Sequence, residues 1–486
     1  MSTPGRGWIV AGSAAVLALG GGPAAADWQD HITLTAQDRA RAEVVDFFRP
    51  PDGAAPAAAH RYAFYGNQLR AGLRAIFPHA ELGVELQDTR ILHLPDDASL
   101  GAPFGNLGPG ATYFANTHDR DQGEPFLKQA HLTVRQSGVA AEVGRFEYRD
   151  GLETLPGDAT LLALKRMRIA ERLVGPFGYT HVTRSFDGAR LAIDRPDWNV
   201  TAQVTRPTAG GFEVSANREI GHVSLAGIAL TAKRLPHAPP IDARLFYLYY
   251  EDGRRETVKV DNRPAAVRSA DKGQIAVHSF GGHVIGVVDV GPGAVDGLVW
   301  GTFQDGTWGD LDHRAWAYAV EAGYQLPRLP GAPWLRLGYD RSSGDDNPAD
   351  GRHGTFFQVL PTARIYAQFP FYNLMNDADL FVQLLATAFD RVNVRLDWHW
   401  LRLADSHDLW YSGGGATNER VFGFAGVPAG GHHDLAHVAE AALDVKVVEH
   451  LTASVYYAHA FGQSVVGATF SGTDANYGYV ELTLRY

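Results

Sequence analysis

The chain ends on the stretch Val480-Glu481-Leu482-Thr483-Leu484-Arg485-Tyr486, in which apolar and polar residues alternate strictly. Successive side chains of a β-strand point to opposite faces, so the stretch predicts a strand with one apolar face and one polar face. Lipid on one side and water on the other surround a strand in the wall of a transmembrane β-barrel. The C-terminal stretch therefore predicts a barrel strand that ends on a lipid-facing aromatic residue.

The same period of two recurs along the chain, in residues 33–45, 68–77, 81–89, 393–400, 438–447, 451–457 and 476–486. A sheet in lipid must close on itself, because an open edge would leave backbone groups without hydrogen-bond partners. At about 25 residues per strand and connection, residues 27–486 accommodate roughly 18 strands. We therefore expect an all-β protein, a transmembrane antiparallel β-barrel of about 18 strands, as one domain.

The first 26 residues have the features of a secretory signal peptide. Arg6 provides a positive charge, residues 8–19 form a short apolar run, and Ala24-Ala25-Ala26 provide small residues before Asp27. We expect cleavage near Ala26 and insertion of residues 27–486 into a bacterial outer membrane. No stretch approaches the roughly 20 apolar residues of a spanning helix, and the absence of cysteine excludes disulfides and a lipid-modified cysteine.

Charge narrows the choice of partners. A formal charge of −11 argues against nucleic acid, which favours a basic surface. Only six of the 43 basic residues are lysines, and arginine binds carboxylates bidentately, although a GC-rich genome also explains the bias. Alternation places eight charged residues on polar, lumen-like faces: Arg39, Arg41, Arg70, Arg74, Arg395, Asp397, Glu440 and Asp444. Such a lumen would attract anionic solutes, unless its arginines and acids only pair with one another across strands.

Two segments depart from simple alternation. In residues 139–150 the polarity switches between the faces, so that Arg145 and Arg149 share a face with Val139 and Val143. Residues 160–172 have helical spacing and carry Lys165, Arg166, Arg168 and Arg172. This helix has two interpretations, a loop folded into the pore or a solvated helix outside the barrel.

Five segments recur in a characteristic order along the chain: Gly144-Arg145-Phe146-Glu147-Tyr148-Arg149-Asp150-Gly151, Ser185-Phe186-Asp187-Gly188-Ala189-Arg190-Leu191, the run from Gly338 to Pro348, Phe357-Gln358-Val359-Leu360-Pro361-Thr362, and the segment from His399 to Tyr411. In this order they resemble the motifs of the alginate export family of outer-membrane barrels. The resemblance covers essentially the whole chain after the signal peptide and is most specific in residues 333–411. The first motif differs from the family at Phe146, because members usually have glutamine directly after the arginine.

The resemblance implies an 18-stranded barrel, and its best-known member exports the polyanion alginate through an arginine-rich constriction. Carried over by motif position, Arg145 and Arg149 are expected to line the pore. We expect a channel for passive movement of hydrophilic, anionic solutes, with outer-membrane lipid and anionic sugars or oligosaccharides as partners. The alternative is a dedicated exporter of an acidic exopolysaccharide such as alginate, which would work with a periplasmic scaffold.

A barrel enzyme, such as a lipase or protease, is a third hypothesis, but the sequence lacks the required chemistry. Ser406 and His407 are neighbours in the chain, whereas a catalytic triad is assembled from distant segments. The histidines at 432, 433 and 437 lead into a strand, and the acids at 345, 346 and 350 form an incomplete calcium pattern. We expect no catalytic residue, no cofactor and no metal site.

Overall fold

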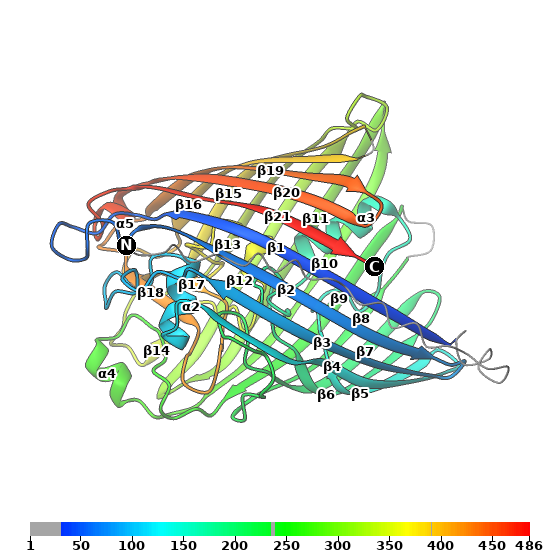
Figure 1. Cartoon of the computed structure of the whole chain (residues 1–486), viewed down its shortest axis with the longest axis horizontal. Coiled ribbons are helices and arrows are strands. Elements are labelled where there is room, and N and C mark those ends of the chain that lie inside the picture. Colours follow the sequence, from blue (N-terminus) through cyan, green and yellow to red (C-terminus); the bar gives the residue numbers. More distant parts are fainter. Residues whose placement is uncertain (1–30, 235–238, 390) are drawn as a thin grey trace, which may run out of the picture.

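A computed structural model of the chain describes residues 31–234, 239–389 and 391–486, so the expected signal peptide, residues 1–26, lies outside the described residues. The fold is a closed antiparallel barrel of 18 strands, as predicted (Figure 1). Its strands are β1 (Ile32–Asp46), β2 (Arg61–Ile76), β3 (Ala80–Leu92), β4 (Gln122–Gln136), β5 (Val139–Phe146), β6 (Phe186–Asp194), β7 (Trp198–Pro207), β8 (Val223–Ala232), β9 (Ile241–Asp252), β10 (Ile275–Val290), β11 (Gly293–Trp308), β12 (Leu311–Gln325), β13 (Trp334–Ser342), β15 (Asp377–Ala388), β16 (Val392–Leu403), β19 (Asp434–Val448), β20 (Leu451–Gly462) and β21 (Asp474–Arg485).

The C-terminal strand closes the barrel. β21 pairs antiparallel with β1 from Gln37↔Arg485 to Asp46↔Asn476, and Tyr486 exchanges backbone hydrogen bonds of 2.9 and 3.0 Å with Ala36. Its two faces are those predicted by alternation. The outward face is exposed, as at Leu482, whereas Thr483 is buried on the inward face.

The two ends of the barrel differ in their connections (Figure 1). At the end where the C-terminus is marked, turns of two to eight residues join the strands, whereas the opposite end carries connections as long as residues 147–185. Short periplasmic turns and longer extracellular loops are typical of outer-membrane barrels, so the long connections belong to the extracellular end. These connections contain α2 (Pro109–Thr117), α3 (Ala159–Leu164), η1 (Lys165–Ile169), α4 (Ala265–Ala270), η2 (Ala363–Ile365), α5 (Ser464–Gly467), β14 (Arg352–His353), β17 (Leu409–Gly413) and β18 (Phe424–Pro428). None of the helices that the structure describes is long and apolar enough to cross a bilayer.

Two of these connections fold back into the lumen, and we call residues 147–185 and 343–376 the inward segments. Arg168 Nε lies 2.8 Å from Glu321 Oε1 of β12, and Arg172 Nη1 lies 3.2 Å from Asp340 Oδ1 of β13. All four side chains are buried, so a solvated helix outside the barrel is the wrong interpretation of residues 160–172. Lys165, Arg168 and Arg172 of this segment are inside because the barrel wall offers them buried carboxylates, whereas Arg166 remains exposed.

The other inward segment packs on aromatic residues inside the extracellular half of the barrel. Phe371 contacts Phe48, Phe369 and Trp410 with ring centroids 4.8–5.9 Å apart, and all four rings are buried. Only the short β14 of this segment pairs with a wall strand, β12, so buried apolar contact does much to fix the rest of the segment. The lumen is therefore narrowed by packed protein.

The stretch 139–150 is shorter as a strand than its pattern suggests. β5 ends at Phe146, and residues 147–150 already belong to the first inward segment. Gly144 adopts a φ of 121°, a conformation that favours glycine, just before the strand ends. The switch in polarity therefore marks the point where the chain leaves the wall.

Candidate functional site: an arginine-lined cavity in the lumen

A cavity of about 370 Å³ lies between the inward segments and the wall formed by β1, β16 and β21. We call it the arginine cavity, because five guanidinium groups and a single carboxylate are on its walls. The lining residues are Arg41, Arg149, Arg166, Met167, Glu171, Gly178, Tyr179, Thr362, Arg364, Ile365, Gln368, Arg395 and Tyr479.

Two of the arginines project from the barrel wall and are balanced by acids. Arg41 of β1 lies 2.6 Å from Glu481 and 3.3 Å from Glu43, and it donates a hydrogen bond of 2.8 Å to the carbonyl oxygen of Tyr179. It therefore fixes the tip of the first inward segment to the wall. Arg395 of β16 pairs with Asp397, two residues further along the same face.

Two more arginines come from the first inward segment. Arg149 lies 3.0 Å from Glu171 and 3.5 Å from Glu147, while half of its side chain remains exposed. Arg166 is exposed within the π-helical turn η1 and has no carboxylate within 4 Å among the residues the structure describes. Its charge is therefore available to a solute.

Arg364, in η2 of the second inward segment, has the least usual environment. It is buried at 6% exposure, and no carboxylate of the described chain lies within 4 Å of it. It donates a 2.7 Å hydrogen bond to the hydroxyl of Tyr477 and lies 4.6 Å from the ring centroid of Tyr179. Aromatic faces attract a cation without neutralising it, so Arg364 adds a full positive charge to the cavity.

Together these contacts give the cavity an excess of positive charge. Acids balance Arg41, Arg149 and Arg395, whereas Arg166 and Arg364 are left without a carboxylate partner among the described residues. A low-dielectric wall strengthens the field of such groups. Guanidinium forks bind carboxylates bidentately, so a carboxylated solute is the ligand that this cavity suits best.

Of the ten residues singled out from the sequence, only Arg41, Arg149 and Arg395 line the arginine cavity. Arg39 and Arg70 also lie inside the barrel, but protein groups engage them. Arg39 donates a 2.8 Å hydrogen bond to the carbonyl oxygen of Gly178, and Arg70 lies 3.1 Å from Glu147. These two arginines hold the first inward segment in place.

The structure corrects the position expected for Arg145. This residue forms a two-pronged ion pair of 2.6–2.7 Å with Asp187 and donates a 2.7 Å hydrogen bond to the carbonyl oxygen of Asn217. Arg145 and Val143 are two residues apart in β5, so their side chains lie on the same face of the strand. Val143 is 55% exposed on the outer face. Arg145 therefore ties neighbouring strands to the loop between β7 and β8 and does not reach the arginine cavity.

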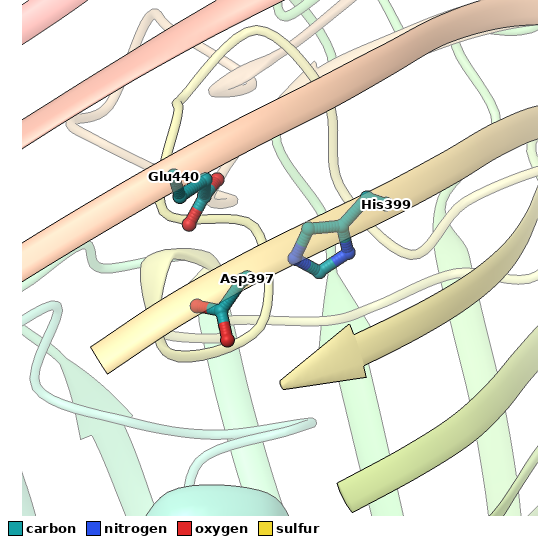
Figure 2. A group of neighbouring side chains, drawn as sticks. All are labelled: Asp397, His399 and Glu440. Atoms are coloured by element: carbon teal, nitrogen blue, oxygen red, sulfur yellow. The ribbon is translucent and has the colours of Figure 1, made fainter. Parts of the chain in front are cut away.

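The remaining predicted residues lie elsewhere. Arg74 is half exposed near the periplasmic end of β2, 2.5 Å from Glu81, and Asp444 is exposed near the same end of β19. Asp397 and Glu440 are buried in a separate cluster inside the wall with His399, which the sequence analysis did not select (Figure 2).

Sequence reasoning missed Arg166 and Arg364 as cavity residues. Arg166 stood out only as part of a basic helical stretch, and that stretch gave no direction for its side chains. Arg364 lies two residues after the motif that ends at Thr362, which was its only signal. Both residues are on loops, where no period of two assigns a face.

Solved structures with similar folds are outer-membrane porins. OccK11 (OpdR) of Pseudomonas aeruginosa is 12% identical with a TM-score of 0.53, over 94% of this chain and 96% of that one. OccAB2 of Acinetobacter baumannii is 8% identical with a TM-score of 0.57, over 94% and 98%. OccK2 (OpdF) of P. aeruginosa, solved in complex with glucuronate, is 9% identical with a TM-score of 0.55, over 94% and 98%. These likenesses support the fold.

No curated protein matches the sequence significantly. The family described as Alginate export, in contrast, matches residues 31–477. This match runs from the first described residue to within β21, and it includes both inward segments and every residue that lines the arginine cavity except Tyr479. Because it covers nearly the whole chain, the protein belongs to the Alginate export family of outer-membrane β-barrels.

Proposed function

We propose that the barrel is a passive outer-membrane channel for small hydrophilic anions, in particular carboxylated sugars, and that the arginine cavity is its selective constriction. The observation that carries the proposal is the ratio of five arginines to one carboxylate on the cavity wall, with Arg166 and Arg364 lacking acidic partners among the described residues. Local charge in a pore, and not the total charge of the protein, determines which ions enter. A protein of formal charge −11 can therefore select anions.

The acids around the cavity are consistent with passage and not with permanent binding. Glu171, Glu481 and Asp397 each compete with a solute for one cavity arginine. Conduction requires sites that are attractive enough to enter and weak enough to leave. A volume of about 370 Å³ also suits one small ligand, since small-molecule sites span about 300–1,000 Å³.

The relative OccK2 was solved with glucuronate, a carboxylated sugar, which supports this solute class for a barrel of the same fold. The family description favours a second function, export of an acidic polysaccharide such as alginate. In an exporter the arginine cavity would guide successive uronate units. The two functions share the cavity and differ in the length of the solute.

Block of ionic current by glucuronate tests the role of the arginine cavity, which both functions share. We expect glucuronate to reduce the chloride current of the purified barrel in planar bilayers, and we expect Arg166→Gln/Arg364→Gln to weaken this block at least tenfold. The matched control is Arg314→Gln/Arg402→Gln, two exposed arginines of β12 and β16 that lie outside the arginine cavity. The control should be blocked like the wild type.

Block by oligouronates of increasing length then distinguishes a channel for small anions from an exporter. A channel for small anions should be blocked more weakly as the oligomer grows, whereas an exporter should bind longer oligomers more tightly. Absence of any glucuronate block in the wild type, or an equal loss of block in the control variant, would refute a role of the arginine cavity in solute selection.

A further inference from the structure

We propose that Asp397, His399 and Glu440 form a binding site for one divalent transition-metal cation of the Zn²⁺ type inside the barrel wall. One possible ligand atom from each residue lies within 4.8 Å of the others (Figure 2). Asp397 and His399 share the inward face of β16 because they are two residues apart, and Glu440 is the direct cross-strand partner of Asp397 on β19. Strand geometry alone therefore brings the three side chains together.

The three residues carry polar atoms without partners. His399 Nε2, Asp397 Oδ1 and both carboxylate oxygens of Glu440 have no hydrogen-bond partner in the described protein. The residues are 2–6% exposed. Buried polar groups are normally satisfied, and two buried carboxylates side by side repel one another. A cation between them would satisfy all of these atoms at once.

The other polar atoms of the same residues are already engaged. Asp397 Oδ2 accepts a hydrogen bond from Arg395, and His399 Nδ1 lies 2.7 Å from Asp379 Oδ2 of β15. The atoms without partners are therefore the ones that face the cluster. An ion pair between a charged His399 and Asp379 would account for one contact, and the buried hydroxyl of Tyr456 would serve one oxygen of Glu440, but Asp397 Oδ1 and the second oxygen of Glu440 would still lack a partner.

Asp379 contacts His399 and contributes no ligand atom to the proposed site. A metal-bound histidine usually donates its second ring N–H to a carboxylate, which fixes the tautomer and the ring orientation. Here a hydrogen bond from Nδ1 to Asp379 leaves the lone pair of Nε2 directed at the cluster. Asp379 is thus a positioning residue for the proposed site.

The ligand set decides the class of metal. One imidazole nitrogen with two carboxylates suits Zn²⁺ and similar transition metals, whereas Ca²⁺ and Mg²⁺ prefer oxygen ligands alone. Three protein ligands and one open position are common for Zn²⁺, with bonds of about 2.0–2.2 Å. Ligand atoms around such an ion are about 3.4 Å apart, so small side-chain rotations close the separations of up to 4.8 Å.

The site is linked to the arginine cavity through Asp397, which also pairs with the cavity residue Arg395. A metal bound to Asp397 would neutralise the carboxylate that pairs with Arg395. The guanidinium of Arg395 would then be freer to bind a solute. We therefore expect Zn²⁺ to increase the preference for anions. This consequence rests on the proposed function, whereas metal binding itself does not.

Titration of the refolded, chelator-treated barrel with ZnCl₂, followed by calorimetry, tests the site. We expect one ion per chain, a loss of affinity of at least 100-fold in His399→Gln and Glu440→Gln, and a 10–100-fold loss in Asp379→Asn. Matched controls are Asp444→Asn on the same strand as Glu440 and His459→Gln on β20. A further control, His432→Gln/His433→Gln, removes exposed histidines that could bind zinc adventitiously.

Cobalt provides a readout that does not depend on the stability of a variant. Co²⁺ bound to the wild-type barrel should give visible absorption bands typical of nitrogen and oxygen ligation, and ZnCl₂ should remove them. Absence of stoichiometric Zn²⁺ and Co²⁺ binding, or unchanged affinity in folded His399→Gln and Glu440→Gln, would overturn the proposal. Zinc binding without any change in ion selectivity would count against the proposed function of the cavity and leave the metal site standing.

Discussion

Replacing Leu396 with arginine tests the assignment of lipid and lumen to the two faces of β16. Leu396 is 45% exposed on the outer face of the barrel, and Arg395, one residue earlier, points inward with 17% of its side chain exposed. The wild-type strand therefore already accommodates an arginine on one face. Leu396→Arg places the same group on the other face.

The cost follows from the depth of the residue. Leu396 is four residues from Val392, where β16 begins at the periplasmic end. At about 3.4 Å per residue and a strand tilt of about 40°, it lies roughly 10 Å above that end, close to the middle of an apolar band about 25 Å tall. An arginine facing lipid at the midplane costs about 2–4 kcal/mol.

Urea unfolding of the barrel in lipid vesicles measures this cost. We expect Leu396→Arg to lower the free energy of unfolding by about 2–4 kcal/mol with an unchanged dependence on urea. Leu396→Met is the control, because it keeps an apolar side chain of similar volume and should cost less than about 1.5 kcal/mol. If Leu396→Arg is as stable as Leu396→Met, residue 396 does not face lipid and the two faces of β16 are assigned the wrong way round.

Three further substitutions test the closure of the barrel by β21, the buried ion pairs of Glu321, and the anchoring of the first inward segment. Tyr486→Asp should reduce the yield of heat-modifiable barrel, because it charges the lipid end of the closing strand, whereas Tyr486→Phe should assemble normally. Glu321→Gln should destabilise the fold by about 3–5 kcal/mol, as measured by urea unfolding, because it removes the buried carboxylate that Arg168, Arg172 and Arg336 share. Arg41→Gln removes the hydrogen bond to the carbonyl oxygen of Tyr179 and should make the first inward segment more sensitive to protease added from the extracellular side, while an unchanged cleavage pattern would contradict this role.

The barrel could be predicted from the sequence because lipid and water impose opposite requirements on alternate residues. The faces expected for Leu482 and Thr483 are those of the structure. Alternation did not predict the end of the strand in residues 139–150, because β5 ends at Phe146 and the chain then enters the lumen. A switch in polarity indicated that something changed there, but it could not tell a strand end from an uncertain register.

The arginine cavity could be predicted only in part. Alternation selected Arg41 and Arg395, because both are on wall strands. Arg364 could not be found in this way, because its direction depends on packing against tyrosines distant in sequence, such as Tyr179 and Tyr477. Arg145 was transferred by motif position, yet its partner Asp187 on the adjacent strand engages it away from the cavity.

The reversal potential of the purified barrel under a salt gradient shows whether the arginine cavity selects anions. We expect the wild type to prefer chloride to potassium despite its formal charge of −11, and we expect Arg166→Gln/Arg364→Gln to reduce this preference at least twofold, while Arg314→Gln/Arg402→Gln does not. A wild-type channel that prefers potassium, or an anion preference that survives the loss of Arg166 and Arg364, would contradict selection by the arginine cavity.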